Sequence, residues 1–184
     1  LLFTPITYLK GGAIIETIAA AAGHEAFMTA MREVLLAHEH RTVHGDDVLL
    51  AMARVLPPIF GDEAARLAMV TELFEKSGLT EIAISTRCTA ANDNIVIVEL
   101  TKQVVARFPL CLRIGDAAGS SRTCLALTQR VEIPTKGCAR YALPANGEGY
   151  LRFTLSPQLR QTTNLASTEL TPREQFTFDR AAHN

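Results

Sequence analysis

A tyrosine near the start of the chain stands beside two glycines at a spacing that could serve catalysis. The stretch TPITYLKGGAI contains Tyr8, Gly11 and Gly12, and Ile15 follows it. On a helix these four residues share one face, so the glycines would leave the surface beside the phenol bare and open to a ligand or another backbone. Each glycine inside a helix costs about 1 kcal/mol relative to alanine, which indicates that the bare surface has a use. A structural role for the ring stays open, because Phe3 and Tyr8 have the spacing of a hydrophobic staple.

The other polar candidates favour structural roles. The stretch AHEHRTVH holds His38, His40 and His44, but it does not match the H-E-x-x-H pattern of zinc peptidases. A β-branched pair and a glycine after His40 predict a loop there, so we expect these histidines to be solvated at a helix end. Lys10 should face away from the tyrosine and be solvated or paired, and Arg152 should form a structural ion pair.

The four cysteines give no sign of a metal or redox motif. Cys88, Cys111, Cys124 and Cys138 are widely spaced and contain no C-x-x-C pair, which argues against a zinc knuckle and against a thioredoxin-like site. Their neighbours are apolar and strand-like, so we expect buried, reduced thiols. A disulfide stays possible, because an even number of cysteines in a secreted protein would permit one.

Composition excludes several classes of function. The chain has 184 residues, 48% of them hydrophobic, so it can bury a core. Its 18 basic and 19 acidic residues, three tyrosines and no tryptophan provide neither the charge nor the stacking surface for nucleic acid. No stretch approaches the roughly 20 apolar residues that span a bilayer, and no signal peptide is recognisable. We therefore expect a soluble protein, with the cytoplasm favoured, that binds neither nucleic acid nor membrane.

Helical patterning fills the first part of the chain. Thr4 is an N-cap and Pro5 suits the first helical position. Apolar spacing and capping signals predict four helices, over residues 5–22, 24–39, 46–55 and 62–77. Gly78 would cap the fourth helix.

Short β-rich runs replace the helical pattern after that point. The runs EIAIST, DNIVIVEL, PLCLRIGD, TCLALTQRVEI, RYALPAN and GYLRFTLS are separated by Asn, Asp and Gly turns. They predict an antiparallel β-sandwich over residues 79–156. A polar connector over 157–169 should follow, and then Thr171, Pro172 and Glu174 form a capping box that opens a helix. The expected fold class is α+β: an N-terminal segment of about four helices, an antiparallel β-sandwich and the start of a further helical region.

The order of these features resembles a known family, the aminopeptidase N-like zinc metallopeptidases, or gluzincin aminopeptidases. The family pattern runs Tyr-x-Lys-Gly-(Ala/Gly), a helix, Gly-x-x-x-Phe, a second helix and Asp-Asp. The matching residues are Tyr8, Lys10, Gly11, Gly12, Gly23, Phe27, Asp46 and Asp47. Further on, ELFEKSGLTEIAI is similar to the family's passage into its β-sandwich, NGEGYLRFTLSP to the strand that closes that domain, and LTPREQ to the start of the C-terminal helical domain.

The resemblance implies a domain plan and an activity. Residues 1–78 would be the helical C-terminal part of a thermolysin-like catalytic domain, 79–156 the β-sandwich domain, and 157–184 the connector and first helix of a C-terminal helical domain. The chain would be part of a zinc-dependent aminopeptidase that hydrolyses the N-terminal peptide bond of peptides. Tyr8 would be its catalytic residue, hydrogen-bonding the oxyanion of the tetrahedral intermediate.

The family's other catalytic parts are absent from this sequence. The H-E-x-x-H zinc motif and the loop that binds the substrate's amino terminus would lie upstream of Leu1, in the remainder of the aminopeptidase polypeptide. Zinc would thus be bound by residues outside this chain, and the chain by itself should be inactive. Phe74 stands where the family has tryptophan, and Leu151 replaces a tyrosine of the closing strand, which indicates a divergent member. A non-catalytic, aminopeptidase-like scaffold or interaction subunit is the alternative.

Overall fold

Four helices form the N-terminal part of the protein, as predicted. The computed structural model describes residues 5–89, 94–145 and 150–165. The helices are α1 (Pro5–Ala22), α2 (His24–Ala37), α3 (Gly45–Val55) and α4 (Glu63–Glu75), with a short 3₁₀ turn, η1 (Pro58–Phe60), before the last of them. Within the described residues, no helix is long and apolar enough to cross a membrane.

Capping residues set the helix boundaries close to those expected from sequence. The α1 helix has the predicted bounds, and α2 ends two residues earlier than predicted, with His38 as its C-cap. Asp62 lies outside α4 as its N-cap, where its carboxylate accepts a hydrogen bond from Ala65 N at 2.8 Å. After α4 the chain turns at Gly78, whose φ of 98° suits a residue without Cβ.

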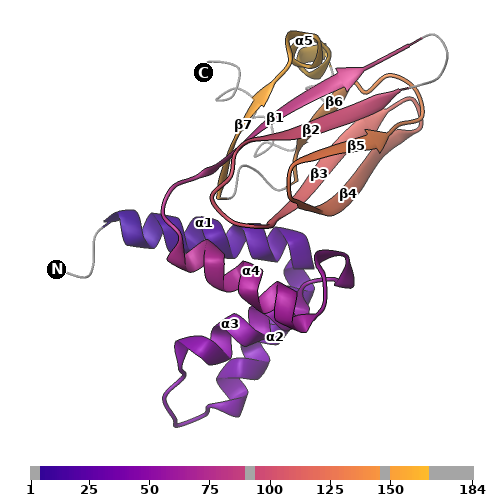
Figure 1. Cartoon of the computed structure of the whole chain (residues 1–184). Coiled ribbons are helices and arrows are strands. Elements are labelled where there is room, and N and C mark those ends of the chain that lie inside the picture. Colours follow the sequence, from indigo (N-terminus) through magenta and orange to yellow (C-terminus); the bar gives the residue numbers. More distant parts are fainter. Residues whose placement is uncertain (1–4, 90–93, 146–149, 166–184) are drawn as a thin grey trace.

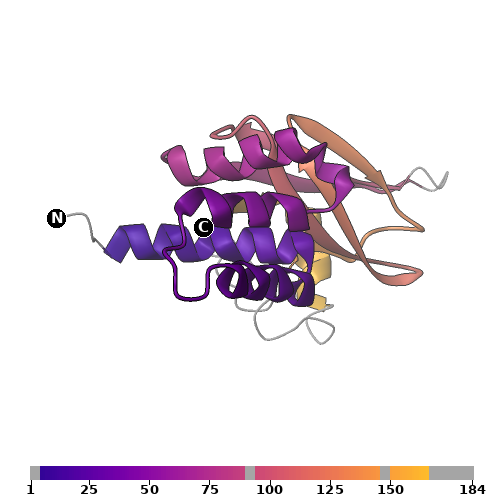
Figure 2. The same ribbon diagram turned by 90° about the horizontal axis from the view of Figure 1, so that it is seen from below.

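In the described residues, seven strands make two sheets. The strands are β1 (Thr80–Arg87), β2 (Ile95–Lys102), β3 (Phe108–Asp116), β4 (Gly119–Leu127), β5 (Arg130–Pro134), β6 (Tyr141–Pro144) and β7 (Leu151–Leu155). Their order is β5-β2-β1-β7 in one sheet and β4-β3-β6 in the other. Apolar side chains of both sheets join in one core, among them Ile82, Ile84, Val96, Val98, Leu110 and Leu112. Figure 1 shows α1 and α4 directly beneath this sandwich and α2 and α3 farther from it, and Figure 2 shows the same helical layer from below. The fold class is therefore α+β, as predicted.

One strand pair departs from the predicted antiparallel sandwich. The β7 strand runs parallel to β1, with Thr80 opposite Leu151 and Ile84 opposite Leu155, whereas every other strand pair of the described residues is antiparallel. The chain reaches β7 from β6, which lies in the other sheet, so β7 arrives by a crossover between sheets and not by a hairpin. Such a crossover permits parallel pairing. Alternating apolar residues do not specify strand direction, which is why the sequence pattern missed it.

The segment after the sandwich is also different from expectation. The polar connector predicted from residue 157 begins with a helix, α5 (Pro157–Leu165). Ser156 precedes it, and its Oγ accepts a hydrogen bond from Leu159 N at 3.4 Å. A serine followed by proline is an N-cap signal, so the sequence contained the information. The helix predicted from Thr171 lies outside the described residues.

The cysteines form two disulfides, so the prediction of reduced thiols is wrong. Cys88 bonds Cys138, with the Cα atoms 5.3 Å apart, and Cys111 bonds Cys124, with the Cα atoms 4.0 Å apart. The second pair is directly opposed on neighbouring strands β3 and β4. Spacing along the chain could not show this, because the pairing depends on strand register and on how the two sheets stack.

Candidate functional site

Tyr8 lies on an open face of α1. Its side chain is 67% exposed, and Ile15 on the same face is 39% exposed. A Cβ added at Gly11 or Gly12 would meet no atom within 4 Å. The surface beside the phenol is thus bare, in the way that the glycine spacing predicts. The staple with Phe3 falls on a residue outside the described part of the chain.

The opposite face of α1 is anchored to the rest of the protein. Ile14 and Ile18 are fully buried in the core. The Thr17 hydroxyl donates to Ala13 O at 2.9 Å and accepts a hydrogen bond from Tyr150 N, just before β7, at 2.7 Å. This packing sets the direction of α1, and the helix in turn sets where Tyr8 stands.

Lys10, two residues after Tyr8 in the sequence, provides a further anchor for α1. Its ammonium donates to the carbonyls of Phe74 and Lys76, both at 2.7 Å, at the C-terminal end of α4. It also lies 5.7 Å from the centre of the Tyr150 ring, a distance typical of a cation–π contact. The sequence left solvation and pairing open for Lys10, and the structure shows pairing, with backbone carbonyls at a helix end, where a cation is favoured. Burial raises the pKa of the Tyr150 phenol.

The three histidines do not converge. His38 is half-buried, with its Nε2 3.2 Å from Asp47 Oδ2 and its Nδ1 2.9 Å from Val34 O. His44 caps α3 together with Asp47, whose carboxylate accepts a hydrogen bond from His44 N at 3.1 Å. His40 is exposed and lies 3.5 Å from Glu39. The predicted loop between α2 and α3 is confirmed. His40 is solvated as predicted, but His38 is not, because its side chain joins the end of α2 to the start of α3.

A groove between α2 and α3 was not predicted from the sequence. It has a volume of about 620 Å³, and its walls come from residues of both helices. Most of the α2 wall is made of small side chains such as Ala26, Ala30 and Ala37, while Glu33 and Arg54 supply charges. Small residues at helical spacing are the signal that could have indicated it. His38 and Asp47, whose ion pair is described above, also line it.

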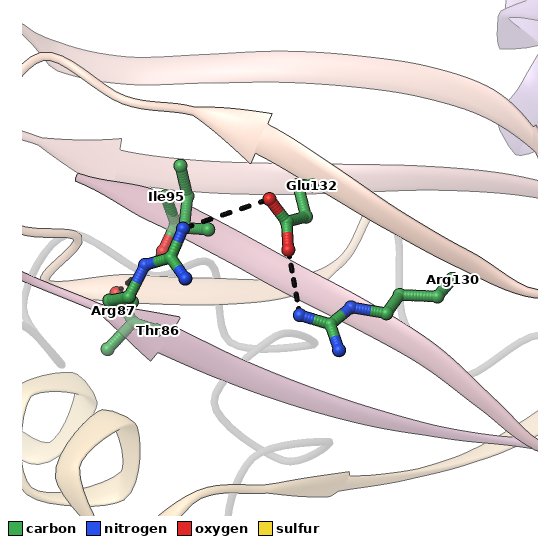
Figure 3. Close-up of polar contacts among 5 residues, drawn as sticks. All are labelled: Thr86, Arg87, Ile95, Arg130 and Glu132. Carbon is green, nitrogen blue, oxygen red and sulfur yellow. Dashed lines mark hydrogen bonds and ion pairs between the residues drawn. The ribbon is translucent and has the colours of Figure 1, made fainter. Parts of the chain in front are cut away.

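The exposed ion pairs of the sandwich are structural. In Figure 3, Glu132 of β5 lies between Arg87 of β1 and Arg130 of β5. Glu132 Oε2 is 3.9 Å from Arg87 Nη2, and Glu132 Oε1 is 2.7 Å from Arg130 Nη2. Arg152 Nη1 of β7 lies 4.0 Å from Glu81 Oε1 of β1. This is the structural ion pair predicted for Arg152. Surface pairs of this kind contribute about 0–1 kcal/mol each. Their contribution to strand pairing is therefore small.

The described residues do not fit a zinc ion. Within the part of the chain that the structure describes, no group of three or more His, Cys, Asp or Glu side chains could hold a metal. What the chain does present is a tyrosine on a bare and well-anchored helix face. Comparison of the sequence with protein-family models and with curated proteins finds no match.

Proposed function

We propose that this chain is part of a zinc-dependent aminopeptidase and that Tyr8 is its catalytic side chain. The observation that carries the proposal is the contrast between the two faces of α1. One face holds an exposed phenol beside two glycines with open space around them, and the other is fixed by buried isoleucines and by hydrogen bonds to the sandwich. A reacting group must be both accessible and held in place.

The phenol has a specific role in peptide hydrolysis. When water adds to the carbonyl of the N-terminal peptide bond, the carbonyl oxygen becomes an oxyanion. The Tyr8 hydroxyl donates a hydrogen bond to that oxygen, which stabilises charge that is present mainly in the transition state. Gly12 leaves room for the peptide backbone to approach the ring. Zinc ligands would come from the remainder of the polypeptide, because the described side chains do not fit the ion.

Replacing Tyr8 with phenylalanine in the polypeptide that contains this chain tests the role. The change removes one oxygen, so fold and zinc content should be retained while kcat falls by about 10²–10³ and KM changes little. Tyr141→Phe is the matched control, because the Tyr141 phenol is fully buried in the sandwich and inaccessible to a substrate. Gly12→Leu should also lower activity, although it improves helix propensity. Equal activity of Tyr8→Phe and Tyr141→Phe, with zinc confirmed by metal analysis, would refute the catalytic role.

A non-catalytic interaction subunit is the second candidate. The α2 helix exposes Met28, Leu35 and Leu36 by 48%, 64% and 65%, and the groove beside it is largely apolar. Apolar surface of this kind often marks a protein contact. Sequencing the polypeptide upstream of Leu1 separates the two candidates: an H-E-x-x-H motif favours the enzyme, and its loss favours the interaction subunit.

The two disulfides bear on the compartment. Disulfides persist in oxidising compartments and are rare in the cytosol, so they favour an extracellular, periplasmic or luminal location over the cytoplasm that the sequence favours. Alkylation of the protein inside cells, followed by non-reducing electrophoresis, tests this. Four alkylated cysteines in the native protein would restore the cytoplasmic assignment.

A further inference from the structure

The Cys111–Cys124 disulfide joins two sulfurs in different surroundings. Cys111 of β3 is 5% exposed, whereas Cys124 of β4 is only half-buried. An external reagent therefore reaches Cys124 more easily. One arginine contacts both this disulfide and the C-terminal end of α1. The bond therefore lies close to the point where α1 approaches β3 and β4.

That arginine is Arg122. It precedes Cys124 by two residues on β4, so both side chains are on the same face of the sheet. Its Nη2 lies 3.6 Å from Cys111 Sγ, and the same nitrogen donates a hydrogen bond to Ala20 O in the last turn of α1. A single guanidinium thus links the disulfide to the end of the helix.

We propose that the Cys111–Cys124 disulfide is a thiol–disulfide exchange site for a low-molecular-weight thiol, with Cys124 as the sulfur attacked and Cys111 as the leaving group. A positive charge beside a sulfur favours its thiolate, and the sulfur with the lower thiol pKa leaves faster. Arg122 stands beside Cys111, and access favours attack on Cys124. The greater exposure of Cys124 and the positive charge beside Cys111 therefore favour the same reaction, in which Cys124 Sγ is attacked and Cys111 Sγ leaves.

The reaction balances with two molecules of thiol. The first thiolate attacks Cys124 Sγ and forms a mixed disulfide, while the electron pair of the broken bond leaves with Cys111 Sγ. A second thiolate attacks the small-molecule sulfur of that mixed disulfide and releases Cys124 as a thiolate. The protein disulfide is reduced to two thiols after protonation by solvent, and the two small thiols are oxidised to their own disulfide.

The second disulfide serves as an internal reference. Cys88 and Cys138 are both exposed, and Cys138 Sγ lies 4.0 Å from the neutral oxygen Asn94 Oδ1. Its reduction should not depend on Arg122. If an Arg122 variant changes the reduction rate of the Cys111–Cys124 bond alone, the effect comes from Arg122 and not from a general change in stability.

The test treats the full chain and its Arg122 variants with reduced glutathione at pH 7, then quenches with an alkylating reagent and maps the peptides by mass spectrometry. We expect glutathione on Cys124 in the trapped intermediate. Arg122→Gln should slow reduction of the Cys111–Cys124 bond by about 3- to 10-fold, because loss of the neighbouring charge raises the pKa of the leaving thiol. Arg122→Lys keeps the charge and should restore most of the rate, and the Cys88–Cys138 rate should stay the same in all three proteins. Glutathione on Cys111, or an equal response of both disulfides to Arg122→Gln, would overturn the proposal.

Discussion

Removing the ammonium of Lys10 should weaken the junction between α1 and α4. The change Lys10→Met keeps an unbranched stem but leaves the carbonyls of Phe74 and Lys76 without their donor. Lys76 is exposed, so water can replace the lost contact there, whereas the hydrogen bond to Phe74 O is partly buried. We therefore count one charged hydrogen bond at the low end of its range, about 1.5 kcal/mol, and about 0.5 kcal/mol for the contact with the Tyr150 ring.

The expected loss in the free energy of unfolding is thus about 2 kcal/mol, which corresponds to a fall in Tm of about 4–8 °C for a chain of this size. Urea unfolding of the purified chain, with an unchanged m-value, measures it. The matched control is Lys102→Met. The Lys102 ammonium lies 3.4 Å from Glu81 Oε1 with its side chain 57% exposed, so this variant should lose about 0.5 kcal/mol or less. Equal losses in the two variants would refute the view that Lys10 holds the helix ends together.

Three further outcomes are expected. Gly115→Ala should cost about 1–3 kcal/mol in urea unfolding, because a Cβ there would overlap the Tyr141 ring; a variant as stable as the parent would contradict this packing. Burial raises the pKa of Tyr150 above its ordinary value of 10.0, so the folded state retains a proton that the unfolded state loses. Stability should therefore be unaffected below pH 10 and fall as the pH rises beyond it, and Tyr150→Phe should lessen that alkaline loss; an identical pH profile would argue against it. Finally, the purified 184-residue chain should bind zinc no more tightly than micromolar and hydrolyse no aminoacyl substrate, since its described side chains offer no fitting ligand set; stoichiometric tight zinc in metal analysis would contradict this and would indicate a site at the histidines.

Local signals predicted most of the fold. The bounds of α1, the end of α4 before Gly78 and the apolar spacing of the helices depend on signals that act over a few residues, so they can be read directly from the sequence. Asp62 differs slightly from its prediction, because the sequence pattern predicts it inside the fourth helix and it instead lies just before that helix as the N-cap. The bare surface beside Tyr8 could likewise be predicted, because glycine spacing on a helix determines it. These features require no knowledge of how distant segments meet.

Features that depend on distant contacts could not be predicted in the same way. The cap that Lys10 provides to α4 joins residues 64 and 66 positions apart. The disulfide between Cys111 and Cys124 requires the register of β3 and β4, which an alternating pattern leaves open to a shift by two residues. The α5 helix is a different case, because Ser156 and Pro157 did mark its start and the polar composition concealed it.

The parallel pairing of β1 and β7 has a consequence for how the sandwich would respond to mechanical load. The helical layer leads into the start of β1 at Thr80, and the chain leaves its last strand at the far end of β7, after Leu155. Because the two strands run in the same direction, a pull between these points acts along the strands and loads their hydrogen bonds in shear, all together. An antiparallel pair pulled from the same end would instead open one hydrogen bond at a time. Tension applied between the helical layer and the segment after β7 would therefore act on all five residue pairs of β1 and β7 at once. The sandwich could then transmit force without its strands separating one hydrogen bond at a time.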